Sequence, residues 1–488
     1  MMIIILLLRL IYVYILLILC NCNDNNYDND VISSSSSSSY RRLLTTTSSS
    51  TVPKTATNEK LFYMYELDEK YWWAWPEVGT NCDKNKYINW HYGNLSGIGP
   101  PINIDDGLFL TWHFSMFSAL WNRFKRSSRR TRDPEKASLF IIPYDLALDG
   151  YTDRKNCLNR NPLRCSTGYV YELQQMLKHS KYFHRHKGAD HAVLWSLHQY
   201  HALPRSCDGF ILRFCEKCTF TCYWMNYTEP NNRFVSIPFP SAYHWWDGIK
   251  TVPWDIANAA NRTLKAVYVG STLTITSYHT QIRRAMTGQC KVQNNCHWSR
   301  IFHSSTDTRF VDFVTIYKKA EFCLCPPGDD PGRKAVFDSI VSGCIPVVFH
   351  ESTISNQYPW HMGEDIALDI SVYIPGTKLI SGEIDLMKVL NGISPDIIKK
   401  KQAAIAIIAP KIHYSIPPIQ YLYNRSDETL WDPPFKDAAD LTLDGMFERV
   451  ENLLKNKSTN IPNKIFSTHE WLQKYNDIRI QIPSNILA

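Results

Sequence analysis

The stretch that most constrains this chain of 488 residues lies at 321–351 and reads EFCLCPPGDDPGRKAVFDSIVSGCIPVVFHE. Its first apolar run, 322–325, stops at two prolines, which is typical of a buried strand that ends there. The second run, 345–349, is rich in β-branched residues and is predicted to be the next strand. Apolar residues recur at helical spacing between the runs, and Gly343 lies where a helix C-cap is expected. The stretch therefore predicts strand, loop, helix and strand.

In a parallel α/β sheet, such a unit places its first loop at the carboxyl edge of the strands, where ligands bind. Free N–H groups and the positive end of the helix dipole attract phosphate there. Gly328 and Gly332 would let a ligand approach the backbone, and Arg333 and Lys334 add two cations. We expect a diphosphate here, with Asp338 about one and a half turns further in, near sugar hydroxyls. The alternative is an ordinary βαβ unit with a solvated first helical turn.

The N-terminus predicts a membrane anchor. Residues 2–20 are apolar except for Arg9, and this length is close to that needed to span a thin bilayer. Because no A-x-A pattern precedes Asn21, an uncleaved signal-anchor is favoured over a cleaved signal peptide. Residues 21–58 are rich in Asn, Ser and Thr and cannot bury enough apolar surface to order themselves. Anchor, stalk and body form the layout of a lumenal, membrane-tethered enzyme.

Cysteines and glycosylation motifs agree with a lumenal body. Fourteen cysteines are many for a cytosolic enzyme, and Cys290 and Cys296, which flank a short polar loop, are the favoured disulfide pair. Cys215, Cys218 and Cys222 have the spacing C-x2-C-x3-C, but no second half-site for zinc follows, so disulfides are preferred there too. The N-glycosylation motifs are at Asn94, Asn226, Asn261, Asn424 and Asn456.

Charge gives little support for a nucleic-acid partner. The formal net charge is +7, and the densest basic run is RFKRSSRRTR at 123–132. Such a run could face nucleic acid or an anionic polysaccharide, but it is more often a solvated surface. No nucleic-acid-binding motif accompanies it, so we expect no nucleic-acid partner.

The length exceeds that of a single typical core, so two domains are expected. Residues 59–255 alternate predicted strands, such as 138–145, with helical segments, among them 107–124. A second α/β unit starts with the predicted strand 266–270. These two halves predict two Rossmann-like domains that face a cleft. The expected division is 1–20 (anchor), 21–58 (stalk), 59–255, 256–460 and 461–488 (tail).

The stretch 322–362 resembles, nearly end to end, the signature of the exostosin-like glycosyltransferases and, among them, of the plant xyloglucan galactosyltransferase group. The resemblance implies a GT-B fold with an N-terminal acceptor-side domain and a C-terminal nucleotide-sugar-binding domain. It also implies inverting transfer without an obligatory metal or other cofactor. The chain departs from the family at Ala192, where a bulky aromatic is usual, and in the DDPG loop after Gly328. Looser matches occur at 140–149, 188–191, 235–240, 264–271 and 436–450.

With this resemblance, the diphosphate expected at Arg333 becomes that of a UDP-sugar, and the hydroxyls near Asp338 become those of its ribose. The glycine turn after strand 266–270 and the helix that follows it add further candidates. The candidate nucleotide-sugar-binding residues are Gly270, Ser271, Arg283, Gly328, Asp329, Gly332, Arg333, Lys334 and Asp338.

An inverting transfer needs a base that takes the proton from the acceptor hydroxyl. Asp190 and His191 are the favoured candidates, because they are adjacent and match the family's Asp-His pair. Asp149, in the loop after strand 138–145, is the alternative. Asp190 and His191 could instead have a structural role, with Asp190 capping a loop and His191 packing beneath the cleft.

The leading hypothesis is an inverting glycosyltransferase of the Golgi lumen, a single-pass type II membrane protein held by residues 2–20. It would move a sugar, galactose-like by the resemblance, from a UDP-sugar to a polysaccharide or glycoprotein glycan. Its expected partners are the UDP-sugar, the glycan acceptor, the membrane and, as an oligomer, itself or other glycosyltransferases. The alternatives are a catalytically silent glycan-binding or scaffolding subunit of a transferase complex and a soluble phosphate-binding regulator.

Overall fold

The computed structural model describes residues 60–455, with gaps at 68–97, 145–168, 197–213, 226–232, 256–261 and 301–309 and short breaks at 100, 112, 114, 251, 253, 355–356, 363–365 and 423–426. The chain divides into two compact units, 1–57 and 58–488, and all described residues belong to the second. The expected anchor, stalk and tail, Asp149 and the five glycosylation motifs lie outside the described residues. Among the described helices, none has both the length and the apolar content needed to cross a membrane.

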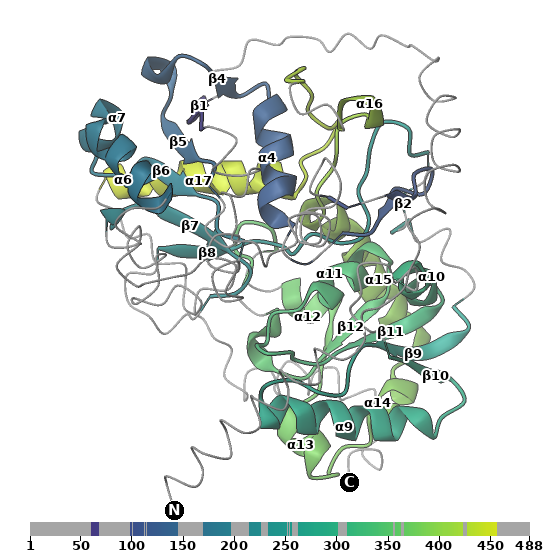
Figure 1. Ribbon diagram of the computed structural model, residues 1–488. Coiled ribbons are helices and arrows are strands. Elements are labelled where there is room, and N and C mark those ends of the chain that lie inside the picture. The colour runs from purple at the N-terminus through teal and green to yellow at the C-terminus, as the bar shows by residue number, and fades with distance from the viewer. Residues whose placement is uncertain are drawn as a thin grey trace, which may run out of the picture. The chain divides into compact units, whose positions relative to one another are not determined.

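The first half of the described chain forms a parallel sheet of six strands in the order β4-β1-β5-β6-β7-β8 (Figure 1). Because every pairing is parallel, the carboxyl ends of all six strands lie at one edge. The strands are β1 (Phe62–Met64), β4 (Arg130–Thr131), β5 (Leu139–Ile142), β6 (His191–Val193), β7 (Thr219–Cys222) and β8 (Phe234–Ser236).

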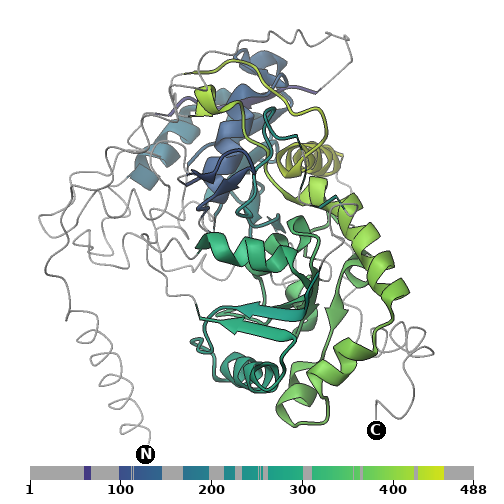
Figure 2. The same ribbon diagram turned by 90° about the vertical axis from the view of Figure 1, so that its right-hand side faces the viewer.

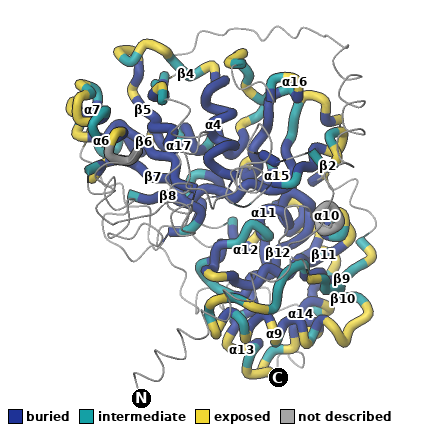
Figure 3. The backbone as a smooth tube through the Cα atoms, viewed as in Figure 1, coloured by how far each residue is buried: buried dark blue, intermediate teal, exposed yellow. Residues whose placement is uncertain are grey.

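The second half forms a parallel sheet of five strands in the order β10-β9-β11-β12-β13. Helices cover both of its faces, with α9 on one side and α10 on the other (Figure 2). The inner strands of both sheets are buried (Figure 3). The strands are β9 (Leu264–Val269), β10 (Cys296–Ser299), β11 (Ala320–Cys325), β12 (Ile345–Val348) and β13 (Val372–Tyr373). The described residues are therefore α/β, with two parallel sheets.

The α-helices connect and cover these sheets. Two short 3-10 segments, Pro134–Lys136 and Glu351–Thr353, also occur. The helices are α4 (Met116–Arg126), α6 (Tyr169–His179), α7 (Lys181–Arg185), α9 (Ser277–Lys291), α10 (Phe310–Lys318), α11 (Lys334–Val341), α12 (Ile366–Ile370), α13 (Gly376–Ile380), α14 (Leu386–Gly392), α15 (Pro395–Ile412), α16 (Ile419–Leu422) and α17 (Ala438–Leu454).

The unit predicted from 321–351 is present as β11, α11 and β12, so this local prediction is confirmed. Gly343 follows the end of α11 with a φ of 65°, a left-handed conformation that glycine adopts without steric cost. The strands β11 and β12 pair directly in parallel register, with Phe322 opposite Ile345. The loop before α11 therefore lies at the carboxyl edge of the second sheet.

The helix predicted at 107–124 begins only at Met116, so the first part of that prediction is wrong. Leu108–Phe109 is strand β3, which pairs in antiparallel fashion with β2 (Pro101–Asn103). The N–H of Phe109 donates to the carbonyl of Ala242 at 2.9 Å, a partner that a helix at this position could not use. A long-range backbone contact thus overrides the local helical spacing of the aromatic residues.

The last described helix, α17, packs against α4 and β5 of the first sheet, although its sequence lies in the half expected to form the second domain. Asp437 caps it, because its carboxylate accepts hydrogen bonds from the N–H groups of Ala439 at 2.9 Å and Asp440 at 3.1 Å. The chain thus returns to the first sheet after completing the second.

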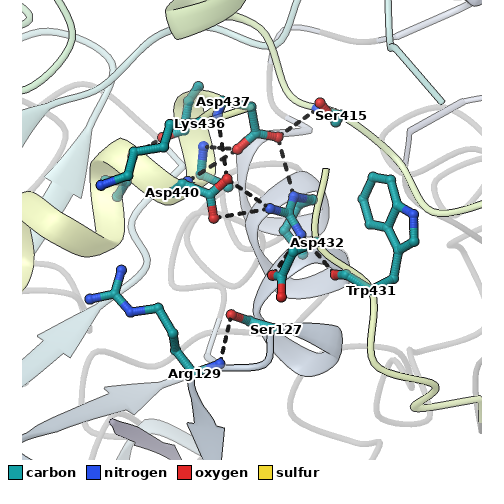
Figure 4. Close-up of polar contacts among 12 residues, drawn as sticks. Ser127, Arg129, Ser415, Trp431, Asp432, Lys436, Asp437 and Asp440 are labelled. Atoms are coloured by element: carbon teal, nitrogen blue, oxygen red, sulfur yellow. Dashed lines mark hydrogen bonds and ion pairs between the residues drawn. The ribbon is translucent and has the colours of Figure 1, made fainter. Parts of the chain in front are cut away.

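A buried ion network joins α4 to the start of α17 (Figure 4). The Arg123 guanidinium donates to Asp437 at 3.2 Å and to both carboxylate oxygens of Asp440 at 3.0 Å. Burial lowers the pKa of Arg123, but the three neighbouring carboxylates outweigh burial and hold it above its ordinary value. Asp432 is the third carboxylate, 3.8 Å from Arg123. Arg123 therefore stays charged and holds two segments that are far apart in sequence.

The rest of the basic run 123–132 is also engaged within the chain. Arg129 pairs with Asp444 at 2.6 Å, Arg130 pairs with Glu428 at 3.4 Å, and Arg126 donates to the carbonyl of Tyr421 at 2.7 Å. The run therefore joins the first sheet to residues 421–444, a role that its sequence alone did not indicate.

We expect Asp440→Asn to change how stability depends on pH. Burial raises the pKa of Asp440 from 3.8 to about 7, although Arg123 opposes this shift. Between these two values the folded state keeps a proton that the unfolded state has lost, so the unfolding free energy falls as pH rises. Urea unfolding measured from pH 4 to pH 7 should therefore show that the unfolding free energy falls less with rising pH in the variant than in the wild type.

Asp444→Asn is the matched control for this measurement. The pKa of Asp444 lies below its ordinary value, because its hydrogen bonds from Lys436 and Arg129 outweigh its burial. Its contribution to stability is present above the unfolded pKa and lost as pH falls, which is the opposite sign. Equal pH slopes in the wild type and Asp440→Asn would contradict the assignment.

Candidate functional site

The carboxyl edge of the second sheet brings two loops together. Residues 270–276 follow β9, and residues 326–333 follow β11, its parallel neighbour in the sheet. The His279 ring donates from Nδ1 to the carbonyl of Gly328 at 2.7 Å, and the N–H of Ile275 donates to the Asp329 carboxylate at 3.2 Å. Asp329 thus holds the two loops together. The candidates Gly270, Ser271, Gly328, Asp329 and Gly332 all lie in these two loops.

Two guanidinium groups lie at this edge. Arg283, on α9, donates to the carbonyls of Pro327 and Ser271, each at 2.8 Å, and is buried. The Arg333 guanidinium lies directly against Gly328, where any Cβ would collide with its Nη1 atom. Arg333 is the N-cap residue of α11. The sequence-predicted cation at the helix start is therefore joined by a second one from another helix.

Two guanidinium groups share this corner with the carboxylate of Asp329, which lies close enough to Arg283 to oppose the lowering of its pKa. Burial and the neighbouring charge of Arg333 together lower the pKa of Arg283 to about 10. Within the part of the chain that the structure describes, neither side chain forms an ion pair with a carboxylate. Because both groups still carry charge at neutral pH, this corner suits an anion such as a diphosphate.

The sequence suggested that Lys334 would face a diphosphate and Asp338 would face sugar hydroxyls, but in the structure these two side chains bond each other. Lys334 donates to both carboxylate oxygens of Asp338 at 2.8 Å. Asp338 is buried and also accepts a hydrogen bond from the N–H of Ala242 at 2.8 Å. Burial raises the pKa of Asp338, and Lys334 opposes that shift. Asp338 thus fastens α11 to the segment after β8, and both of its carboxylate oxygens accept hydrogen bonds from within the protein.

Asp190 and His191 lie at the opposite edge of the first sheet from the one where ligands bind. His191 is the first residue of β6, so the pair is at the amino end of a parallel strand. Asp190 accepts from Arg185 at 2.8 Å and bonds His191 Nδ1 at 2.8 Å. His191 Nε2 bonds the Tyr65 hydroxyl at 2.9 Å. Both side chains are buried and fully engaged, which corrects the expectation that they could reach an acceptor hydroxyl.

The charge states of this pair agree with a structural role. Burial lowers the pKa of His191, and Asp190 opposes that shift, so the ring stays neutral at pH 7. Burial raises the pKa of Asp190, but the hydrogen bonds from His191 and Arg185 outweigh it and hold the pKa below its ordinary value. An ionised aspartate thus orients a neutral histidine that packs against Phe140 and Phe183.

We expect His191→Ala and Asp190→Asn to destabilise the fold by about 1–3 kcal/mol, because each leaves a buried polar partner unpaired. Turnover by the folded fraction should change by less than about threefold, whereas loss of a general base would cost about 10²–10⁴-fold. Chemical denaturation and initial rates on the same samples separate these outcomes. Tyr65→Phe removes the hydroxyl bonded to His191 Nε2, so it should also lower stability while leaving turnover by the folded fraction unchanged.

Six of the eight described cysteines form three disulfides, and Cys222 and Cys325 are free and buried. Cys290 and Cys296, the pair that the sequence favoured, are bonded with an S–S distance of 2.09 Å. Cys323, within β11, and Cys344, just before β12, form a second disulfide that the sequence did not suggest. In the region of the suspected zinc motif, the Cys215 sulfur is bonded to Cys218, which leaves neither thiolate available to a metal. Among the described residues, no group of His, Cys, Asp and Glu side chains is arranged to hold a metal ion.

Comparison with known proteins identifies the family. The family model described as an exostosin GT47 domain matches residues 56–380, well over half of the chain. This chain belongs to the exostosin GT47 family. The match includes both parallel sheets. It also includes Arg283 and Arg333, the two arginines that form the anion corner, so the whole candidate site lies inside it.

The relatives of this exostosin-family chain include plant enzymes. It is 26% identical over 391 residues to an Arabidopsis thaliana protein named "Probable xyloglucan galactosyltransferase GT15", covering 77% of this chain and 78% of the relative. It is 24% identical over 360 residues to "Xyloglucan-specific galacturonosyltransferase 1" of the same plant, covering 70% of this chain and 50% of the relative. Together with the family match, these relatives identify the chain as a glycosyltransferase. The names of these two relatives specify different transferred sugars, galactose in one and galacturonic acid in the other.

Solved structures are only distantly similar. A glycosyltransferase from Rickettsia africae is 10% identical with a TM-score of 0.34, covering 82% of this chain and 100% of that one. The pneumococcal O-GlcNAc transferase GtfA, solved with UDP and GlcNAc, is 9% identical with a TM-score of 0.30, covering 58% of this chain and 60% of that one. Similarity at this level carries no conclusion for this chain.

Proposed function

We propose that this glycosyltransferase transfers a sugar, galactose-like, from a UDP-sugar to a polysaccharide or glycoprotein glycan, with inversion at the anomeric carbon. In this proposal the two sheets belong to two domains of a GT-B arrangement with the reaction in the cleft between them. Residues 2–20 would anchor the chain in the Golgi membrane as a type II protein with its body in the lumen. The xyloglucan galactosyltransferase and galacturonosyltransferase names of the relatives support a polysaccharide acceptor.

The observation that carries the proposal is the pair of guanidinium groups, Arg283 and Arg333, neither of which forms an ion pair with a described carboxylate. A UDP-sugar brings a diphosphate with two negative charges, which match this pair in charge and in hydrogen-bond geometry. As the bond between the anomeric carbon and the diphosphate of the donor breaks, negative charge grows on the leaving diphosphate. Fixed guanidinium groups stabilise that charge more than they stabilise the ground state, which accelerates the reaction.

The acceptor hydroxyl must lose its proton as it attacks the anomeric carbon. Because Asp190 and His191 are buried and bonded within the protein, the candidate base in this proposal is Asp149, which comes after β5 in the sequence and lies outside the described residues. We assign Asp149 as the base within this proposal. An Asp149→Asn variant that binds UDP but does not transfer sugar would support this role, and near-normal transfer would remove it.

A panel of UDP-sugars tests the proposed function. The purified full-length chain is incubated with UDP-galactose, UDP-galacturonic acid, UDP-glucose, UDP-xylose or UDP-arabinose, with and without soluble xyloglucan oligosaccharides, and released UDP is measured. We expect one donor to be turned over, and faster with an acceptor. UDP binding without turnover of any donor would instead indicate a silent glycan-binding or scaffolding subunit. A chain that neither binds UDP nor turns over a donor would refute the proposal.

Chelation should leave most of the activity. Two guanidinium groups and the N-terminus of α11 are available to neutralise the diphosphate, so a divalent cation is not needed for that task. We expect the initial rate in EDTA to stay within about twofold of the rate in buffer alone. A complete loss that added Mn²⁺ or Mg²⁺ restores would contradict a metal-independent transfer.

A further inference from the structure

The carboxyl edges of the two sheets meet at the segment that follows β7. The backbone of Met225 exchanges two hydrogen bonds with the side chain of Gln357, each at 3.2 Å. The Tyr358 hydroxyl donates to the carbonyl of Tyr223 at 3.3 Å. Gln357 and Tyr358 follow β12 and are buried. These contacts fix the end of β7, in the first sheet, against the loop after β12, in the second.

Trp224 lies between these two anchored residues but, unlike Tyr223 and Met225, is partly exposed. Its indole N–H donates to the carbonyl of Ser352 at 3.2 Å, which holds one edge of the ring. The Trp224 Cβ atom lies next to the loop that carries Arg333, since a Cβ placed on Gly332 would be only 3.0 Å from it. Trp224 is therefore an oriented, partly exposed aromatic ring beside the anion corner.

We propose that Trp224 binds a pyranose ring of the glycan acceptor by stacking. The axial C–H groups of a sugar ring form an apolar face that packs on an indole, while the ring hydroxyls stay free to bond water or polar groups. Trp224 belongs to the carboxyl edge of the first sheet, the acceptor side. It also adjoins the loop next to Arg333, so a ring held there lies close to the anomeric carbon of a donor whose diphosphate is on Arg333.

This inference rests on the proposed function. The sheet to which each group belongs favours the acceptor, rather than the donor, as the ligand of Trp224. The donor is held through its diphosphate by groups on the second sheet, Arg283 and Arg333. Trp224 follows β7 of the first sheet, donates to the Ser352 carbonyl and lies next to Gly332. A rigid aromatic ring with few torsions loses little conformational entropy on binding, which suits an anchor for an extended glycan.

The test measures glycan binding without turnover. Isothermal titration calorimetry is carried out on the full-length chain with soluble xyloglucan, cello- and galacto-oligosaccharides, and separately with UDP. We expect Trp224→Leu to raise the Kd for the oligosaccharide that binds by at least about tenfold, while the Kd for UDP is unchanged. Trp224→Phe keeps an aromatic face without the N–H donor and should lose less affinity than Trp224→Leu.

Trp246→Leu is the matched control. Trp246 is also partly exposed and also donates its indole N–H to a backbone carbonyl, that of Ile104 at 3.0 Å, but its ring lies against Gly248, which is outside the loop before α11. Its substitution should leave glycan affinity unchanged. The inference fails if no oligosaccharide binds the wild type, if Trp224→Leu binds it normally, or if UDP affinity falls in parallel. If Trp224→Leu loses glycan binding and the wild type does not bind UDP, the role of Trp224 in glycan binding is supported and the proposed UDP-sugar donor is refuted.

Discussion

Arg333→Ala should lower kcat/KM for the UDP-sugar by about 10²–10³-fold, because it removes a charged donor aimed at the leaving diphosphate. The guanidinium lies over Gly328 and has no ion-pair partner among the described carboxylates, so its loss should leave the fold intact. Arg333→Lys should recover part of the activity, because it keeps the charge but cannot donate two parallel hydrogen bonds. Initial rates across a donor concentration series, with the Kd for UDP from calorimetry, provide the measurement.

Arg284→Ala is the control for this experiment. Arg284 is adjacent to the candidate Arg283 on α9, but its side chain is exposed on the other side of the helix. Its removal changes the net charge by the same amount, and it should leave kcat/KM within about twofold. Unchanged kinetics in a folded Arg333→Ala variant would remove the diphosphate from this corner.

Arg123→Met should destabilise the protein by about 3–5 kcal/mol, the cost of leaving buried carboxylates without their partner. Asp437 is fully buried, and burial raises its pKa, but Arg123, His413 and backbone hydrogen bonds together outweigh burial and hold the pKa below its ordinary value. Without the charge of Arg123, Asp437 would have to take up a proton, or the contact between α4 and α17 would have to open. Urea unfolding followed by circular dichroism measures the effect.

Arg132→Met is the control, since its partners Glu66 and Glu428 are at the surface and its own side chain is 65% exposed. Pairs of this kind contribute no more than about 1 kcal/mol. A similar loss of stability in both variants would show that charge number, rather than the buried network, is responsible. The double variant Arg123→Met with Asp440→Asn should be more stable than Arg123→Met alone, because it removes one of the unpaired carboxylates.

Local features of this fold could be predicted from the sequence because their causes lie within a few residues. Two prolines end β11, Gly343 supplies the left-handed residue after α11, and β-branched residues form β12. Even the disulfide between Cys290 and Cys296 closes a separation of only 6 residues. The signature around Arg333 is equally local, which is why the family and the anion corner could be inferred before any coordinates.

The partners of the charged and aromatic side chains depended instead on how distant segments meet. Arg123 and Asp437 are 314 positions apart, and no local pattern pairs them. Asp190 and His191 match a family motif, but only the direction of β6 shows that they lie at its amino end. Trp224 has no motif at all, and its place beside Gly332 follows from the meeting of the two sheets. The sequence by itself therefore determined the strands, turns and signature through short-range sterics and apolar spacing. Only the tertiary structure decided which side chains are buried, paired or left facing a ligand, because those properties depend on contacts between residues that the chain places far apart.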